Sequence, residues 1–111
     1  MKTGRFGLLA EYAAILIYSA KLYYILHHRL RNIGGEVDLI AIRSKSIVFI
    51  EVKARSSNLD DRLVSSSQQK RIKSTAEVFL KNNPKYYGFN VRFDLVVIRP
   101  FKLPYIIKNA W

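Results

Sequence analysis

Two short apolar stretches of this chain carry charged residues that could do chemistry. The first, Gly35-Glu36-Val37-Asp38-Leu39-Ile40, holds Asp38, and the second, Phe49-Ile50-Glu51-Val52-Lys53, holds Glu51 and Lys53. Charged side chains are costly inside a sheet unless they pair with one another or bind an ion. A metal centre for phosphodiester hydrolysis explains them. A buried structural ion pair is the alternative, although such pairs are usually poor stabilisers compared with apolar residues.

The pairing of two strands would bring the carboxylates together. Side chains alternate along a strand, so Glu51 and Lys53 share one face. If residues 37–43 and 46–53 form a hairpin, Asp38 lies opposite Glu51, with Cβ atoms roughly 4.5–5.5 Å apart. Carboxylates that close repel unless a proton or cation lies between them, and hard oxygen ligands favour Mg²⁺ or Mn²⁺. The turn lacks an Asn-Gly signal, so an odd-length loop that separates the pair stays open.

Composition sets outer limits on the protein. A chain of 111 residues is expected to form one domain, residues 1–111, and without cysteine it has no disulfide or thiolate site. The 19 basic and 8 acidic residues give a net charge of +11, which indicates a polyanionic partner such as nucleic acid. The apolar run 13–26 is interrupted by Lys21 and is shorter than the roughly 20 residues that span a membrane. We therefore expect a cytoplasmic protein without a membrane partner.

The hydrophobic pattern predicts alternating helical and extended segments. Apolar residues at helical spacing predict helices over 5–19 and 68–82, and the segment 56–67 between the motif strands and the second helix is polar enough to be a loop. Strands are expected at 22–30, 37–43, 46–53, 91–98 and 105–107. The order α-β-β-β-α-β-β predicts an α/β fold, with a mixed central β-sheet flanked by helices.

The motifs and their order resemble the YraN family of small bacterial proteins, within the restriction-endonuclease-like PD-(D/E)xK superfamily, which includes archaeal Holliday-junction resolvases. The likeness spans nearly the whole chain. Besides the two motif stretches, it includes Gly7-Leu8-Leu9-Ala10-Glu11 with Ala14, Ala54-Arg55, Lys70-Arg71-Ile72 with Ala76, and Arg92-Phe93-Asp94-Leu95-Val96. Ala10 stands where the family usually has Gly, and Val37 stands where the superfamily name expects Pro.

The resemblance implies a role for each residue of the site. Asp38 and Glu51 would hold a Mg²⁺ or Mn²⁺ ion, with the backbone carbonyl of Val52 as a third oxygen ligand. Lys53 would orient or deprotonate the attacking water and stabilise the charged phosphate. Glu11 would complete the catalytic set from the first helix, and its alternative is an ordinary surface position.

Basic residues near the second helix are candidates for contact with the nucleic-acid backbone. Lys70, Arg71 and Lys73, with Arg62 before them and Arg55 after the second motif strand, are predicted to contact phosphates. A solvated helix face is the alternative.

Other polar residues are expected to serve the fold. Gln68 fits a helix start better than a contact with a phosphate or base, and Asp94 is expected to pair with an arginine rather than bind metal. Adjacent histidines on a strand, His27 and His28, face opposite sides and cannot bind one ion together. Glu36 shares the parity of Asp38, so it could line the rim of the site.

These features together predict a divalent-metal-dependent endonuclease. The expected partner is DNA rather than RNA, cut at branched or structured sites, and a resolvase would need a homodimer to cut two strands symmetrically. One alternative is a basic nucleic-acid-binding module that does not cleave. The other is a protein that binds RNA, ribosomes or another partner through its charge.

Overall fold

The protein is described by a computed structural model that covers residues 5–55 and 64–111. Two helices, one 3₁₀ turn and five strands follow one another along the chain: α1 (Arg5–Ala20), β1 (Tyr24–Asn32), β2 (Gly35–Arg43), β3 (Ser46–Ala54), α2 (Ser66–Lys81), the turn η1 (Pro84–Tyr86), β4 (Asn90–Ile98) and β5 (Tyr105–Ile107). The strands form one sheet in the order β1-β2-β3-β4-β5. Among the strands of the described residues only the β3–β4 pair is parallel, so the predicted α/β fold with a mixed sheet and the order α-β-β-β-α-β-β is confirmed.

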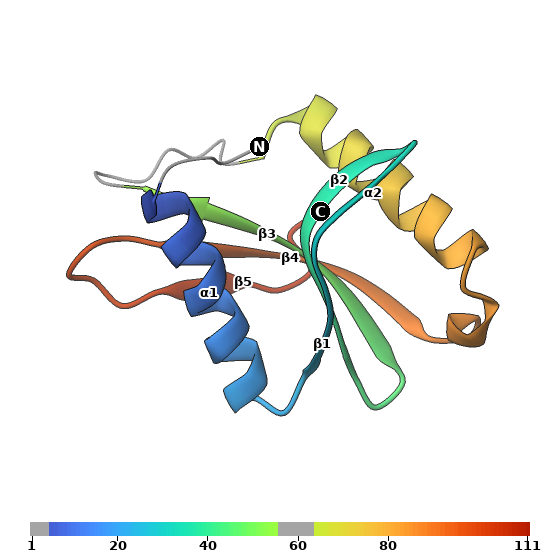
Figure 1. Cartoon of the computed structure of the whole chain (residues 1–111), viewed down its shortest axis with the longest axis horizontal. Coiled ribbons are helices and arrows are strands. Elements are labelled where there is room, and N and C mark those ends of the chain that lie inside the picture. The colour runs from blue at the N-terminus through green and yellow to red at the C-terminus, as the bar shows by residue number, and fades with distance from the viewer. Residues whose placement is uncertain (1–4, 56–63) are drawn as a thin grey trace.

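The sheet separates two apolar layers, each covered by one helix (Figure 1). Ala10, Ala14 and Tyr18 of α1 pack against one face, with Leu39 and Val48 among the buried partners. On the other face, the buried side chains come from β2, β3 and α2: Ile40, Ile47, Phe49, Ile72, Ala76 and Phe79. None of the helices in the described residues is long and apolar enough to cross a membrane.

Most element boundaries differ from the sequence prediction by one or two residues. The first strand runs from Tyr24 to Asn32 instead of 22–30, because α1 is followed by a turn in which Leu22 has a φ of 69°. The second helix begins at Ser66 instead of residue 68, because Ser65 caps it by accepting a hydrogen bond from the N–H of Gln68. Most of the predicted loop 56–67 lies outside the described residues.

The hairpin register that the sequence predicted is confirmed. Arg43 pairs with Ser46 and Leu39 with Ile50, so the β2–β3 turn consists of Ser44 and Lys45. Ser44 adopts a φ of 53°, the left-handed conformation that a two-residue hairpin turn requires, without an Asn-Gly sequence.

Asp94 on β4 ties the first helix to the sheet. It is fully buried and accepts hydrogen bonds from the Tyr18 hydroxyl at 2.7 Å, from Arg92 Nε at 2.8 Å and from the backbone N–H of Asn109 at 3.0 Å. Burial, and then the hydrogen bond to Asp94, raise the pKa of Tyr18. The expectation that Asp94 pairs with an arginine is confirmed, and its role is structural.

Candidate functional site

The backbone pairing of β2 with β3 ends at the two motif carboxylates. The last paired residues of the ladder are Leu39 and Ile50, and Asp38 and Glu51 come next on each strand. The backbone N–H of Val52 donates to Asp38 Oδ2 at 2.8 Å, so the side chain of Asp38 takes the place of a backbone acceptor on β2. The N–H and C=O of a strand residue face the same neighbouring strand, so the carbonyl of Val52 also faces β2.

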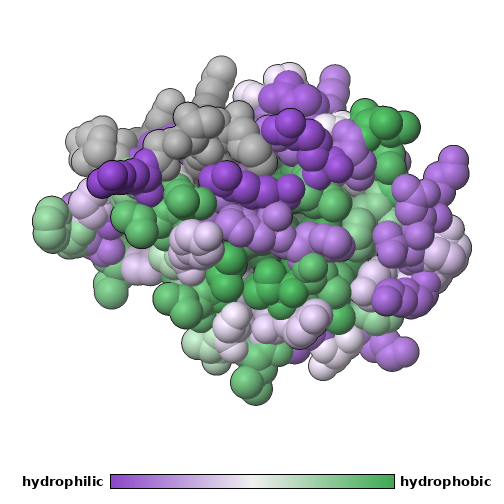
Figure 2. All heavy atoms as spheres, viewed as in Figure 1, coloured by the Kyte–Doolittle hydropathy of each residue, from purple (hydrophilic) through white to green (hydrophobic). Residues whose placement is uncertain are grey.

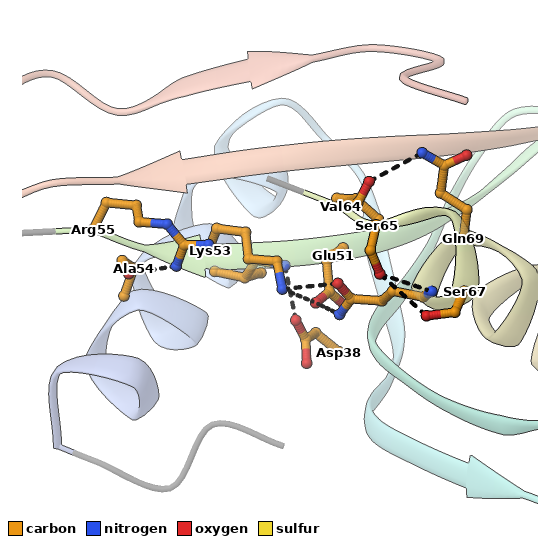
Figure 3. Close-up of polar contacts among 11 residues, drawn as sticks. Asp38, Glu51, Lys53, Ala54, Arg55, Val64, Ser65, Ser67 and Gln69 are labelled. Atoms are coloured by element: carbon orange, nitrogen blue, oxygen red, sulfur yellow. Dashed lines mark hydrogen bonds and ion pairs between the residues drawn. The ribbon is translucent and has the colours of Figure 1, made fainter. Parts of the chain in front are cut away.

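Glu51 and Lys53 are held together by a residue of α2. Lys53 Nζ lies 3.1 Å from Glu51 Oε2, and Gln68 Nε2 donates to the same oxygen at 2.6 Å. Lys53 Nζ also donates to Gln68 Oε1 at 3.1 Å, which closes a triangle of polar contacts. The side chains of Glu51 and Lys53 are only 6% and 14% exposed, so this charge pair is mostly shielded from water. Figure 3 shows Glu51 and Lys53 pointing toward each other beside Asp38.

A pocket of about 230 Å³ lies over this cluster. Its walls come from three elements: Glu36 and Asp38 of β2, Glu51 and Lys53 of β3, and Gln68, Arg71 and Ile72 of α2. The three α2 residues are spaced three and four apart, so they share the face of the helix that is turned toward the strands. The prediction that Asp38, Glu51 and Lys53 lie close together agrees with this geometry, and Glu36 lines the pocket with them.

Gln68 is the site residue whose position the sequence interpretation missed. The sequence favours a helix-start role for Gln68, and its backbone N–H does donate to the capping Ser65, while its side chain contacts Glu51 and Lys53. The sequence Ser65-Ser66-Ser67-Gln68 fits the capping-box pattern, in which the third helical residue reaches back toward the cap. That pattern would have placed the helix start correctly, but it would not have predicted that the Gln68 side chain contacts Glu51 and Lys53.

Glu11 lies apart from the pocket, among the residues packed under α1. It is fully buried, and its Oε1 is 2.7 Å from His28 Nε2 and accepts a hydrogen bond from Arg29 Nε at 2.9 Å. The hydrogen bond to Glu11 is the main cause that raises the pKa of Arg29, and the charge of Asp38 acts in the same direction. Glu11 therefore pairs with residues of β1 and does not line the pocket.

The predicted phosphate-binding residues are distributed between the pocket and the helix surface. Arg71 lines the pocket and its side chain is exposed, and Lys70 and Lys73 are exposed on α2. Arg55 follows β3, where its backbone N–H donates to the carbonyl of Ile98 and its side chain donates to the carbonyl of Ala54. Arg62 lies outside the described residues.

The donor atoms near the pocket are of the kind that bind Mg²⁺ or Mn²⁺. They are the carboxylate oxygens of Asp38 and Glu51 and the carbonyl oxygen of Val52, all hard ligands. Residues 5–55 and 64–111 contain no group of three or more His, Cys, Asp or Glu side chains arranged to hold a metal ion. Mg²⁺ is commonly bound by one or two carboxylates and keeps several water ligands.

Comparison with known proteins identifies one family. The model of the uncharacterised protein family UPF0102 matches residues 10–98. A UPF0102 protein of Rhodopseudomonas palustris strain HaA2 is 43% identical over 95% of this chain and 83% of its own length. The UPF0102 protein of Sinorhizobium medicae is 38% identical over 100% of this chain and 92% of its own length. One from Nitrobacter winogradskyi is 43% identical over 95% and 90%.

Proposed function

The chain belongs to UPF0102, the YraN family that its motifs predicted, and we propose a function for it from the geometry of its own site, because this family is described only as uncharacterised. We infer that it is a divalent-metal-dependent endonuclease that hydrolyses phosphodiester bonds in DNA. The observation that carries this proposal is the position of Asp38, Glu51 and Lys53 at the wall of one pocket, on two strands that separate at these residues.

The metal ion would be held by Asp38, Glu51 and the carbonyl of Val52. When bound, it would activate water and offset negative charge on the phosphate. In its absence, the negative charge of Glu51 is offset by Lys53 and by the amide of Gln68. The same two contacts fix the direction of both side chains before substrate arrives, which is the preorganisation that electrostatic catalysis requires.

Lys53 supplies the cation for the reacting phosphate. Its ammonium group has three donors, and two of them are directed at Glu51 and Gln68. Since its side chain is mostly buried, its charge is weakly screened by water and acts strongly on a phosphate that enters the pocket. We infer that Lys53 orients the attacking water and stabilises charge that develops on the phosphate.

The basic face of α2 would guide the DNA backbone to the pocket. Arg71 belongs to the pocket wall, and Lys70 and Lys73 lie on the same helix with exposed side chains. Together with the net charge of +11, they supply the electrostatic attraction for phosphates on which nucleic-acid binding depends. These contacts are independent of sequence, so preference for branched DNA would come from the shape of the substrate.

Supply and removal of metal test this proposal directly. We expect Mg²⁺ or Mn²⁺ to bind the wild-type protein in a calorimetric titration and to switch on cleavage of a four-way DNA junction. Chelation with EDTA should abolish cleavage, and excess Mg²⁺ should restore it. Wild-type protein that binds neither ion, even with DNA present, and cleaves neither branched nor linear DNA would contradict the proposal.

One observation favours a second candidate, a basic module that binds nucleic acid without cleaving it. Glu51 Oε2 already has two donors, at 2.6 Å and 3.1 Å, so the cluster can exist as a structural ion pair without any metal. Tight DNA binding together with no cleavage at any metal concentration would favour this candidate. Binding of RNA in place of DNA would favour an RNA- or ribosome-associated protein.

The outer face of α1 supports a homodimer. Leu9, Tyr12 and Leu16 are 64%, 50% and 71% exposed, and Figure 2 shows hydrophobic residues gathered over this helix. The only charged residue from Phe6 to Ala20 is Glu11, which is buried. Two copies that each carry +11 repel least where neither presents a charge. We propose that two copies pair through this face, which would provide two sites for cutting two strands.

A charge on α1 tests the homodimer. We expect the wild-type protein to sediment as a dimer and Leu16→Glu to sediment as a monomer, because the substitution places like charges against each other in the apolar interface. Leu103→Glu, at an exposed aliphatic residue outside α1, is the matched control and should remain dimeric. A wild-type protein that is monomeric at every concentration would contradict the pairing.

A further inference from the structure

The β1–β2 turn holds one aliphatic side chain almost entirely in water. Ile33 is 97% exposed, at the end of a hairpin in which Asn32 pairs with Gly35. Single exposed apolar residues are common on protein surfaces and need no explanation by themselves. At this turn, however, neighbouring residues fix the backbone, and the turn lies beside the candidate site.

The turn is fastened to the middle of α2 by its backbone and by Asn32. Asn32 Nδ2 donates to the carbonyl of Thr75 at 3.1 Å, and Asn32 Oδ1 accepts from the N–H of Gly34 at 2.8 Å. A Cβ on Gly34 would lie only 2.6 Å from the backbone of Ser74, so the two backbones are in direct contact. Figure 1 shows the joined ends of β1 and β2 lying against α2. The turn therefore presents Ile33 from a rigid base.

The same turn borders the pocket. An added Cβ on Gly35, the first residue of β2, would lie 3.4 Å from the Cβ of Arg71, which belongs to the pocket wall. Glu36, the next residue, lines the pocket as well and forms an ion pair with Arg31 at 3.1 Å. An extended chain rises roughly 3.3–3.6 Å per residue, so Ile33 lies within roughly 10 Å of the pocket wall.

We propose that Ile33 inserts between neighbouring bases of the DNA bound at the pocket and so makes the enzyme prefer sites where base stacking is already weak. The inference rests on the proposed function. Apolar wedges of this kind, isoleucine included, enter base steps and unstack them. A β-branched side chain is stiff about χ1, so Ile33 needs little ordering before insertion. Arg31, two residues before Ile33, and Arg71 of the pocket wall are exposed and would supply positive charge for phosphates near the opened step.

The inserted side chain explains a preference without any reading of sequence. Unstacking costs a few kcal/mol for each base step, and the cost is smallest where a base is mismatched, unpaired or at a junction. A rigid wedge beside the pocket therefore favours distorted DNA over fully paired duplex, even though the contacts of Lys70 and Lys73 with phosphates are the same for both.

The test uses Ile33→Ser, with Leu103→Ser as the matched control because Leu103 is 85% exposed and lies in the β4–β5 connection. Each protein binds, in EDTA, a four-way junction or a linear duplex that carries the fluorescent base 2-aminopurine. Wild type and Leu103→Ser should raise the fluorescence, which reports unstacking, and should prefer the junction. Ile33→Ser should abolish the rise and lower the preference for the junction about tenfold. Ile33→Leu should restore both.

Either of two results would overturn the inference: Ile33→Ser that unstacks 2-aminopurine like wild type, or Leu103→Ser that loses the signal equally. Thermal melting of each variant shows whether it is folded. The proposed function is judged separately, by metal-dependent cleavage. If wild type cleaves DNA and Ile33→Ser keeps its preference for the junction, the role of Ile33 is rejected and the nuclease function stands. If wild type unstacks DNA but never cleaves it, the nuclease function is rejected and the role of Ile33 stands. Wild type that binds no DNA removes both.

Discussion

Asp38→Asn should lower metal-dependent DNA cleavage by about a thousandfold or more, while the protein stays folded and keeps its affinity for DNA. The asparagine side chain has nearly the same shape, and its carbonyl can still accept the hydrogen bond that Val52 N–H makes to Asp38 at 2.8 Å. The substitution therefore removes one negative charge of the metal site and little else. Single-turnover cleavage of a four-way junction, with metal affinity by calorimetry on the same samples, measures the effect.

Glu36→Gln is the matched control, since it also removes a carboxylate from the pocket wall. Glu36 forms a partly exposed ion pair with Arg31 and stands outside the Asp38–Glu51 pair, so cleavage should change only a few-fold. Equal loss in Asp38→Asn and Glu36→Gln would indicate a general electrostatic effect. Wild-type rates in Asp38→Asn would exclude Asp38 as a metal ligand.

Stability and metal binding of two site variants separate a metal site from a structural ion pair. Glu51→Gln removes the carboxylate that lies 3.1 Å from the mostly buried ammonium of Lys53, so it should cost about 3–5 kcal/mol in either case. Asp38→Asn leaves that contact in place and removes the repulsion between the two carboxylates. If Asp38 serves a metal, Asp38→Asn should abolish metal binding without lowering the stability of the metal-free protein; if the cluster is only a structural ion pair, neither wild type nor Asp38→Asn should bind the ion.

The largest loss of stability is expected for Asp94→Ala. This substitution removes the acceptor for the Tyr18 hydroxyl and the counter-charge of Arg92, and burying an arginine that has lost its partner costs about 3–5 kcal/mol. That loss is a large share of the roughly 5–15 kcal/mol that stabilise a typical domain. Urea unfolding measures it. The pKa of Tyr18 should fall toward its usual value at the same time, since the hydrogen bond to Asp94 raises it.

Glu36→Ala is the comparison for this effect. It breaks the ion pair with Arg31, whose side chain is 71% exposed, and such surface pairs contribute about 0–1 kcal/mol. If Asp94→Ala costs no more than Glu36→Ala, the hydrogen bonds of Asp94 do not hold α1 to the sheet.

The hairpin and the position of its carboxylates could be predicted because they depend on local rules. A strand alternates with a period of two, and a two-residue turn fixes the register, so the residues around Asp38 and Glu51 follow from the sequence once the turn is placed. The faces of His27 and His28 followed from the same alternation. His27 contacts the ring of Phe79 on α2, and His28 contacts Glu11 on α1.

The contacts of Gln68 and Glu11 could not be predicted because they join elements distant in the chain. Gln68 lies in the first turn of α2 and reaches Glu51 on β3 across the packing of the helix on the sheet. Glu11 meets Arg29 near an irregularity of β1, where the register shifts between Ile25 and His27 and Arg29 has a φ of 61°. The irregularity of β1 has no sequence signal such as glycine or proline at the position concerned.

The single parallel strand pair has a consequence for how the protein folds. Strands β1, β2 and β3 form consecutive hairpins that need only short loops to close, whereas the pairing of Ser46 with Asn90 closes a much longer connection that includes α2. Such non-local contacts slow folding. The carboxylates Asp38 and Glu51 are thus expected to meet early, in the hairpins. The contacts of Gln68 with Glu51 and Lys53 form only when α2 docks, so the charged cluster is completed late in folding.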